Sequence, residues 1–570
     1  MIRLLPMSLL LLAWLSSCAD GPTTQPALVA PTPTRSRSLP PPNFRTYEVG
    51  PGQSFPNLGD VPWESLEPGD WVNIHYRPEP YREKIVLCVQ GTVGAPIVIR
   101  GIPGPNGELP VISGEDATTR PQLDFWGEDL GVIKIGGASY PADLVPERIE
   151  LRDLEIRSAR PPYSFTGSDG QRTYASNAAA VYIEKGRNIR LTRLRLHDSG
   201  IGLFIGSFQG ETYGNFVEQC ALFDNGIEGS TDEHNSYTSG RNLYFLANWF
   251  GPLRAGALGS NLKDRSGGLW VEYNWFEGGN RQLDLVETDS SAIVSDPHYR
   301  QTYVYGNVLI EPDGDGNTSI VHYGGDGEDP DIFRKGKLYF YHNTVVSERA
   351  GNTTLLKLST ADETAVVLNN VLHVAGSGSS LAVFDGVGTV ELGGNCVKAG
   401  FVPCHCEPSG VVHDDGSSIA LEDPAFVDPS GDDFRLPVNS PCLDHAVELP
   451  FPLDLYYFPW DQYQPHQQLV ERPYDPPMDP GAFETCKEEP CVRDAGPDID
   501  GICDGTTGTD RFDGADALAP DLDSETPTGD APQGCSCRAG PPAPGPLSSG
   551  PVGFLLYLLV AAAIHRARRR

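Results

Sequence analysis

The side chains most suited to chemistry fall in three short stretches of the chain, residues 232–237, 261–265 and 284–287. Lysine, histidine and tyrosine can transfer protons, and arginine supplies a fixed cation. Aspartate and glutamate offer the hard oxygen ligands that calcium prefers. A surface that brought the three stretches together would therefore combine acid–base groups, cations and carboxylates.

These stretches lie within a repeat of irregular period. Strand-like apolar runs recur, and most end in an asparagine followed by two apolar residues, as in residues 243–250 and 270–276. The asparagines are spaced by 26, 33, 36, 27 and 25 residues, and they are Asn248, Asn274, Asn307, Asn343, Asn370 and Asn395. One coil of a parallel β-helix uses a length of this order. We predict that the asparagines stack at one corner as a hydrogen-bonded ladder, since the amide satisfies buried polar groups and tolerates the left-handed turn conformation.

Aligning the coils on these asparagines places residues 235–237, 261–263 and 284–286 on successive strands. Because strand residues alternate between faces, the middle residue of each triplet points inward and its neighbours point outward. Two outward rows are then predicted, Asn235 with Asn261 and Asp284, and Tyr237 with Lys263 and Val286. Further polar residues flank these rows, namely Asp232, Glu233, His234, Arg265 and Glu287.

Composition and charge restrict the class of protein. Gly 63 and Pro 51 in 570 residues, with 39% hydrophobic residues, favour a turn-rich β protein over a coiled coil or a disordered chain. Lys+Arg 42 against Asp+Glu 76 gives a net charge of −34. We expect no nucleic-acid partner, because phosphates require a basic surface.

Both ends of the chain indicate export. Arg3, the apolar residues 9–14 and Leu15-Ser16-Ser17-Cys18 resemble a bacterial lipoprotein signal peptide (residues 1–17) with Cys18 as the lipidated residue, although an ordinary secretory signal is the alternative. Residues 535–570, with two cysteines, an apolar run and terminal arginines, resemble the sorting tag of myxobacterial surface proteins; a plain transmembrane anchor is the alternative. Residues 18–45 and 486–534 are predicted linkers around a body at 46–485. We expect a monomer at the cell surface, held to the outer membrane by a lipid.

Cysteine usage fits an exported chain. Cys396, Cys404, Cys406 and Cys442 lie near the end of the body, so we predict local disulfides within this group. A metal site at Cys404-His405-Cys406 is less favoured, because it has no second matching pair. Cys88 and Cys220 lie in apolar runs and are predicted core residues.

Residues 66–72 (Leu-Glu-Pro-Gly-Asp-Trp-Val) and 95–101 open the body, and residues 423–426 (Asp-Pro-Ala-Phe) and 479–484 (Asp-Pro-Gly-Ala-Phe-Glu) close it. These segments resemble the right-handed parallel β-helix superfamily of pectate, alginate and chondroitin lyases and their non-catalytic relatives. The resemblance implies an all-β fold, a single-stranded right-handed parallel β-helix over residues 46–485, and an extracellular polysaccharide as partner.

The resemblance also implies eliminative cleavage of uronate-containing glycans, which needs a cation at the uronate carboxylate, a base for the C5 proton and a donor to the leaving oxygen. Lys263 is placed like the lysine of related lyases, and Arg265 beside it would lower its pKa; both are predicted catalytic residues. The predicted sugar contacts are His234, Asn235, Tyr237 and Asn261, and the predicted calcium ligands are Asp232, Glu233, Asp284 and Glu287.

One departure from the lyase pattern leaves the function open. Related lyases carry an arginine on the coil after the lysine, where this chain has residues 283–287 (Leu-Asp-Leu-Val-Glu), with Arg281 nearby. Two functions therefore stand: a calcium-assisted polysaccharide lyase, and a non-catalytic glycan-binding or structural surface protein. A hydrolase using Asp284 with Glu287 or Asp264 is a further alternative. Lys263, Asp264 and Arg265 also fit a solvated, ion-paired turn.

Overall fold

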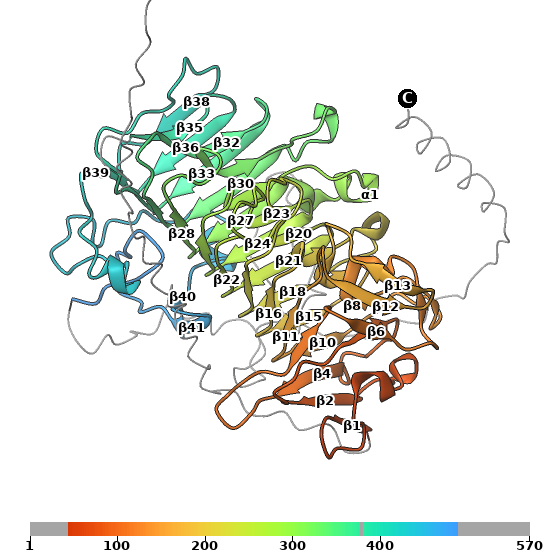
Figure 1. Ribbon diagram of the computed structural model, residues 1–570. Coiled ribbons are helices and arrows are strands. Elements are labelled where there is room, and N and C mark those ends of the chain that lie inside the picture. The colour runs from red at the N-terminus through yellow and green to blue at the C-terminus, as the bar shows by residue number, and fades with distance from the viewer. Residues whose placement is uncertain (1–43, 377–379, 488–570) are drawn as a thin grey trace, which may run out of the picture. The chain divides into compact units, whose positions relative to one another are not determined.

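The computed structural model describes residues 44–376 and 380–487. In this part the chain winds through three long sheets in turn, and each coil contributes a short strand to each sheet (Figure 1). Successive coils pair in parallel, with the register of residues 243–246 on 269–272 and of 302–305 on 338–341 as examples. The fold is a right-handed parallel β-helix, the hand that parallel crossover connections adopt.

The first sheet has 13 strands in the order β1 (Thr46–Val49), β2 (Trp71–His75), β4 (Ile97–Ile102), β10 (Ile149–Arg152), β15 (Arg190–Thr192), β18 (Phe216–Glu218), β21 (Arg241–Leu246), β24 (Gly267–Glu272), β27 (Gln301–Tyr305), β30 (Gly336–Tyr341), β33 (Glu363–Leu368), β36 (Thr389–Gly393) and β38 (Val411–Asp414). The second has 11, in the order β39 (Ile419–Leu421), β37 (Cys396–Lys398), β34 (Val371–Val374), β31 (Thr344–Ser347), β28 (Val308–Glu311), β25 (Trp275–Glu277), β22 (Trp249–Phe250), β19 (Ala221–Phe223), β16 (Arg195–His197), β11 (Glu155–Arg157) and β5 (Val111–Ser113).

The third sheet has 13 strands and carries the candidate site. Its strands are β13 (Gly170–Thr173), β12 (Ser164–Gly167), β6 (Ala117–Thr119), β3 (Glu83–Leu87), β8 (Gly131–Ile135), β14 (Ala179–Ile183), β17 (Ile201–Ile205), β20 (Ser236–Thr238), β23 (Leu262–Asp264), β26 (Leu283–Leu285), β29 (Ser319–Tyr323), β32 (Thr353–Leu358) and β35 (Leu381–Phe384).

The remaining elements lie in turns and loops. Two small antiparallel pairs are β7 (Asp124–Phe125) with β9 (Ala138–Tyr140) and β40 (Asp461–Gln464) with β41 (Gln468–Glu471), and β12 and β13 also pair antiparallel. The helices are α1 (Ser291–Val294), α2 (Leu453–Tyr456) and the 3₁₀ turns η1 (Leu58–Asp60), η2 (Trp63–Ser65), η3 (Glu128–Leu130), η4 (Phe208–Gly210), η5 (Pro297–Arg300), η6 (Pro330–Ile332) and η7 (Pro429–Gly431).

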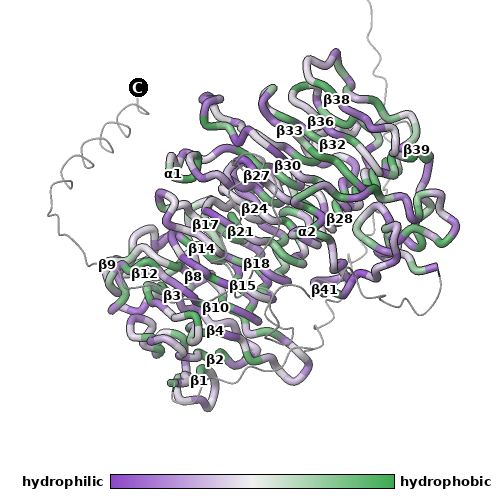
Figure 2. The backbone as a smooth tube through the Cα atoms, turned by 180° about the vertical axis from the view of Figure 1, so that it is seen from behind, coloured by the Kyte–Doolittle hydropathy of each residue, from purple (hydrophilic) through white to green (hydrophobic). Residues whose placement is uncertain are grey.

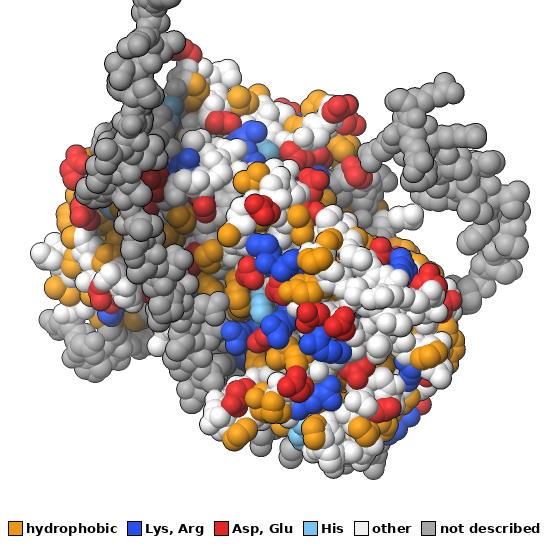
Figure 3. All heavy atoms as spheres, viewed as in Figure 1, with side chains coloured by type: hydrophobic (Ala, Val, Ile, Leu, Met, Phe, Trp, Pro, Cys, Tyr) orange, Lys and Arg blue, Asp and Glu red, His pale blue; other side chains and the backbone are white. Residues whose placement is uncertain are grey.

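One continuous apolar core fills the space between the three sheets. It contains Leu151, Leu191, Val217, Phe245 and Val271 from neighbouring strands of the first sheet. Side chains alternate along each strand, so the polar neighbours of these residues face outward. Figure 2 shows the resulting mixture of hydrophobic and hydrophilic residues along the strands. On the face in Figure 3, basic and acidic side chains lie side by side, and the outer face of the first sheet has ion pairs such as Arg190 with Glu218.

The predicted asparagine ladder is confirmed. The Nδ2 atom of each asparagine donates to Oδ1 of the next, at 2.8 Å for Asn248 to Asn274 and 3.0 Å for Asn274 to Asn307, and the ladder runs on to Asn395. The left-handed residue is the one before each asparagine, for example Tyr273 with φ 52° and Asn369 with φ 56°, and not the asparagine itself as we expected.

After β39 the chain leaves the coils and packs along their outside. Tyr463 lies against Trp275, with ring centroids 5.7 Å apart, and Tyr341 donates its hydroxyl hydrogen to the Tyr457 carbonyl at 2.7 Å. The coils thus end at Leu421, and the rest of the described chain covers an apolar outer surface.

Local disulfides form as predicted, Cys396–Cys442 and Cys404–Cys406, and Cys88 and Cys220 are buried and unpaired. The Cys404-His405-Cys406 segment therefore offers no thiolate pair to a metal. Cys18, both linkers' outer parts and residues 535–570 lie outside the described residues. Among those that are described, no helix is long and apolar enough to cross a membrane.

Candidate functional site

A single row of outward side chains runs along the third sheet. Strand pairing sets Tyr182 opposite Phe204, Phe204 opposite Tyr237, Tyr237 opposite Lys263, Lys263 opposite Asp284 and Asp284 opposite His322. Adjacent strands lie about 4.8 Å apart, so the row presents one side chain at each such step. Aromatic rings at one end of the row give way to charged groups at the other.

The predicted register was wrong by two residues on β26. Asp284 pairs with Lys263, whereas the sequence alignment placed Asp284 beside Asn261 and Val286 beside Lys263. The turn between the asparagine corner and the third sheet differs in length from coil to coil: 15 residues separate Asn248 from Lys263, and only 10 separate Asn274 from Asp284. The correct register brings opposite charges face to face.

A cleft of about 720 Å³ lies over this row. Seven of the ten residues predicted from the sequence for catalysis, sugar contact or calcium line it: Asp232, Glu233, His234, Tyr237, Lys263, Arg265 and Asp284. The other lining residues are Ser176, Asn177, Ile201, Phe204, Thr231, Ser260, Asn280, Arg281 and Asp326. The sequence therefore located the surface, and the functional roles of these residues stay predictions.

Lys263 is held as a cation between two carboxylates. Its Nζ lies 2.7 Å from Asp284 Oδ2 and 2.6 Å from Asp326 Oδ2. Burial lowers the pKa of Lys263, but the two carboxylates outweigh burial and the pKa is raised overall. The pKa of Lys263 is therefore not lowered, contrary to our expectation for a base. The sequence did not reveal the two carboxylates that raise it, because neither Asp326 nor the pairing with Asp284 was predicted. Lys263 is suited to neutralise a negative group and not to remove a proton.

Arg265 connects the cleft cations to the aromatic part of the row. Its Nε donates to the Tyr237 hydroxyl oxygen at 2.9 Å, and its Nη2 lies 3.1 Å from Asp326 Oδ1. Burial opposes its charge, but Tyr237, Asp326 and Glu287 raise the pKa of Arg265 beyond its ordinary value. Arg265 is a fixed cation whose position depends on Tyr237 and Asp326.

His234 is a neutral donor in the wall of the cleft. Its Nδ1 accepts the Ser260 N–H at 2.8 Å, so the ring hydrogen is on Nε2. Burial, followed by the charge of Lys263, lowers the pKa of His234 to about 3. The ring stacks on Tyr237 with centroids 5.7 Å apart. His234 can donate a hydrogen bond to a ligand oxygen but is a poor proton acceptor.

Asp284 is also bound to His322, which the sequence analysis missed. His322 Nδ1 lies 2.8 Å from Asp284 Oδ1, and His322 Nε2 lies 2.9 Å from Ser359 Oγ. Hydrogen bonds and charge from His322 and Lys263 outweigh burial and lower the pKa of Asp284. The Ser359 hydroxyl oxygen also accepts the Gly325 N–H at 2.9 Å and lies 2.8 Å from the Gly325 carbonyl oxygen, so these contacts fix the loop after β29.

Asn235 and Asn261 do not reach the cleft, contrary to the prediction. Both are fully buried, and Asn235 Nδ2 donates to Asn261 Oδ1 at the corner between the second and third sheets. Asn225, which lies on the same coil ten residues before Asn235, donates to Asn235 Oδ1 at 3.0 Å. Asn235 and Asn261 form a second asparagine ladder, which explains why they recur at one position of the coil.

Two of the four predicted calcium ligands, Asp284 and Glu287, make ion pairs within the chain. Asp284 binds Lys263 and His322, and Glu287 binds Arg265 and the Asp326 N–H, so both carboxylates are already neutralised by the chain. No group of three or more His, Cys, Asp or Glu side chains in the described ranges is arranged to hold a metal ion. Asp284 and Glu287 are thus engaged by cations of the chain itself, and calcium binding stays a prediction.

The hydrolase pairs suggested by the sequence are also unsuitable. Asp264 is fully buried inside the helix, 2.8 Å from Arg334, because it lies on the inward side of β23. Glu287 is buried beneath Arg265 and does not line the cleft. Neither carboxylate can flank a glycosidic bond with Asp284.

Asp326 and Arg281 are two charged cleft residues whose part in the site the sequence did not reveal. Asp326 lies on the loop between β29 and η6, 42 residues after Asp284, and carries no motif beyond the Gly-Gly-Asp-Gly sequence of residues 324–327. Arg281 Nη1 lies 3.7 Å from Asp284 Oδ1, so the cation one coil after Lys263 comes from the turn before β26 and not from the strand.

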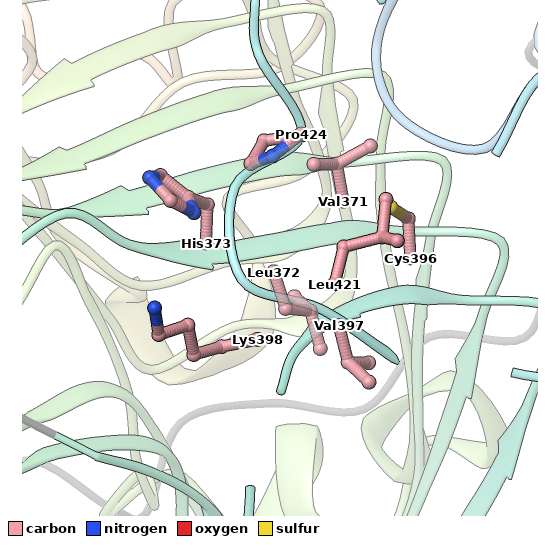
Figure 4. A pocket seen from close by; sticks show the side chains of 8 residues that line it. All are labelled: Val371, Leu372, His373, Cys396, Val397, Lys398, Leu421 and Pro424. Atoms are coloured by element: carbon pink, nitrogen blue, oxygen red, sulfur yellow. The ribbon is translucent and has the colours of Figure 1, made fainter. Parts of the chain in front are cut away.

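A second depression lies at the C-terminal coils (Figure 4). It is lined by Val371, Leu372, His373, Cys396, Val397, Lys398, Leu421 and Pro424, and it encloses no volume for a water molecule. This depression is packing between strands and the segment after β39, not a ligand site.

No family model matches the chain, and no curated protein matches it. Solved structures with similar folds include pectate lyase Pel9A, with 11% identity and a TM-score of 0.34 over 77% of this chain and 96% of that one. An alginate lyase from Paenibacillus sp. str. FPU-7 has 12% identity and a TM-score of 0.27 over 63% of this chain and 95% of that one. A GH136 lacto-N-biosidase from Eubacterium ramulus has 15% identity and a TM-score of 0.31 over 66% and 68%. The likeness concerns the fold, and similarity this distant carries no functional argument.

Proposed function

We propose that the chain is a carbohydrate-active β-helix protein whose cleft binds an extended polysaccharide. The observation that carries this proposal is the row Phe204, Tyr237, Lys263 and Asp284, which puts four outward side chains from successive coils into one cleft. A ladder with a repeat of about 4.8 Å is suited to a ligand that itself repeats along its length.

The chemistry of the cleft favours sugars. Phe204 and Tyr237 stack with parallel rings, centroids 5.7 Å apart, and provide an apolar floor. His234 Nε2, Asn280 and Arg281 offer donors to hydroxyl or carboxyl oxygens from the walls. A concave surface with an aromatic floor and a few converging polar groups is typical of ligand sites.

A second candidate is eliminative cleavage of a uronate-containing glycan, favoured by the Arg265–Tyr237 contact. In this reaction the Tyr237 phenolate takes the C5 proton, the C4–O4 bond breaks, a C4=C5 double bond forms, and Tyr237 returns the proton to the leaving oxygen. Arg265 donates to the Tyr237 oxygen at 2.9 Å and so holds it in position in the cleft. Lys263 neutralises the uronate carboxylate, in place of the base role predicted from the sequence.

We further propose that the protein acts outside the cell, lipid-anchored through Cys18 at the outer membrane. Support comes from the lipoprotein-like signal and the cysteine-containing C-terminal segment. Mass analysis of membrane-extracted protein tests this location: a diacylglyceryl mass on Cys18 is expected, and an unmodified Cys18 would contradict it.

Titration calorimetry against alginate, pectate, chondroitin and neutral glucan oligosaccharides tests the binding proposal. Binding to at least one polysaccharide is expected, and absence of binding to an enlarged panel would overturn the proposal. Ultraviolet absorbance of the unsaturated uronate product, followed in the same samples, separates the two candidates. A rise that Tyr237→Phe abolishes supports elimination, and binding without a rise leaves a non-catalytic module.

A further inference from the structure

Asp326 presents its carboxylate to two cations at once. Oδ2 lies 2.6 Å from Lys263 Nζ, and Oδ1 lies 3.1 Å from Arg265 Nη2. This two-point contact is the one a carboxylate of a ligand would make with the same cations. We propose that Lys263 and Arg265 form a carboxylate-binding site in the cleft, that Asp326 occupies it as an internal substitute, and that a ligand carboxylate displaces Asp326. The proposal rests on the proposed function and specifies the ligand group.

The two cations remain in place without Asp326. Lys263 has a second carboxylate, Asp284, on the facing strand, and Arg265 contacts Tyr237 and Glu287. The side chains of Lys263 and Arg265 are 10% and 19% exposed, whereas that of Asp326 is 36% exposed. The acid is therefore the partner that can leave, and the cations form a preformed site.

The main chain around Asp326 is fixed, so displacement requires only rotation of its side chain. The Asp326 N–H donates to Glu287 Oε2 at 2.8 Å, and Gly325 is bound to Ser359 through both its N–H and its carbonyl. Glycines at 324, 325 and 327 let this loop pack closely on its neighbours, because a Cβ there would lie within 2.6 Å of Ser359, Phe333 and Glu287, respectively. The backbone stays where it is while the carboxylate turns toward solvent.

The energetics favour exchange over simple addition. Removing Asp326 alone would leave two partly buried cations with less compensation, which is costly. Replacing the Asp326 carboxylate by a ligand carboxylate retains both ion pairs. The free energy of binding then reflects only the difference between the ion pairs made by the ligand and those made by Asp326. A neutral sugar cannot make this exchange. The cleft should therefore discriminate by charge, and its affinity for acids should rise when Asp326 is removed.

Chemical rescue tests the inference without a polysaccharide. Asp326→Ala is expected to unfold at a lower temperature than wild type, and sodium acetate or glucuronate is expected to raise that temperature toward the wild-type value. Acetamide and glucose should have no such effect, and sodium chloride at equal ionic strength controls for salt. Glu328→Gln, which removes an exposed acid two residues away, should behave as wild type throughout.

Asp326→Asn provides the second readout if the alanine variant folds poorly. Asparagine keeps the shape but weakens the hold on the cations, so this variant should bind glucuronate about tenfold more tightly than wild type in calorimetry. Equal or weaker binding by Asp326→Asn, or stabilisation of Asp326→Ala by acetamide as much as by acetate, would overturn the inference. Acetate rescue without polysaccharide binding would leave the carboxylate site standing and reject the proposed function. Polysaccharide binding without carboxylate-specific effects would support the proposed function and reject the carboxylate site.

Discussion

Lys263 Nζ and Asp284 Oδ2 face each other across neighbouring coils at 2.7 Å, with 10% and 6% of their side chains exposed. This pair is the centre of a continuous polar network, since Asp326 binds the lysine from the loop side and His322 binds the aspartate from the next coil. The strand register creates the pair, because residues at equivalent positions on adjacent parallel strands lie next to each other. The charges of the cleft are thus fixed before any ligand arrives.

Asp284→Asn is expected to destabilise the protein by about 3 kcal/mol, because it leaves the buried Lys263 with one carboxylate and replaces the charged acceptor of His322 by a neutral amide oxygen. Denaturant unfolding measures the change. Asp289→Asn, five residues along and exposed, is the matched control and should stay within about 0.5 kcal/mol of wild type. Equal stability of the two variants would show that the network contributes nothing to folding.

His234 should make the fold less stable in acid. Burial lowers the pKa of His234 from 6.5 in the unfolded chain to about 3 in the folded chain. Between these two pH values the imidazole is therefore protonated in the unfolded chain and neutral in the folded chain. Stability attributable to this group is therefore full above pH 6.5 and is lost as pH falls toward 3, by about 1.4 kcal/mol per pH unit.

In His234→Asn the amide oxygen can still accept the Ser260 N–H, but the side chain no longer titrates. The plot of unfolding free energy against pH should therefore lose this contribution to its slope between about pH 4 and 6, which lies between the folded and unfolded pKa values of His234. The exposed His413 serves as the control position in His413→Asn. An unchanged slope in His234→Asn would contradict a buried neutral imidazole.

Asn307→Ala tests the ladder. The amide accepts from Asn274 N–H and Nδ2 and donates to Val271 O, Tyr305 O and Asn343 Oδ1. Its loss leaves several buried groups without partners, and we expect about 3 kcal/mol of destabilisation in denaturant unfolding. Asn352→Ala, at an exposed site, should cost less than about 0.5 kcal/mol. A small effect at Asn307 would mean that water replaces the amide.

The ladder also shows what the sequence could and could not predict. Asn248 to Asn395 recur in the sequence because each coil needs an amide at one corner, so the solenoid and its stacking were predictable. The register at Asp284 was not, because the turns before it change length from coil to coil without a signal. The contact of Asp326 with Lys263 was not predictable either, because a loop brings together two residues that are 63 positions apart in the sequence. Because these partners were not predicted, we expected the pKa of Lys263 to be lowered, whereas it is raised. For the same reason the carboxylates of Asp284 and Glu287 were expected to be available to calcium.

Tyr237→Phe removes the hydroxyl that accepts from Arg265 and keeps the ring that packs on Phe204 and His234. We expect polysaccharide affinity to fall about tenfold, because Arg265 loses a contact that orients it in the cleft. Tyr140→Phe, at an exposed tyrosine outside the cleft, is the control. Equal affinity of both variants would place the ligand away from Tyr237.

The ligand is expected to lie in the cleft over the third sheet, and a variant that blocks this cleft tests the expectation most directly. Asn177 is an exposed residue of the cleft lining, so Asn177→Trp should obstruct the cleft without disturbing the core, while Asn352→Trp adds the same bulk at an exposed position that does not line it. Titration calorimetry with the best polysaccharide of the panel should show binding by wild type and Asn352→Trp and none by Asn177→Trp. Undiminished binding by a folded Asn177→Trp variant would contradict the account.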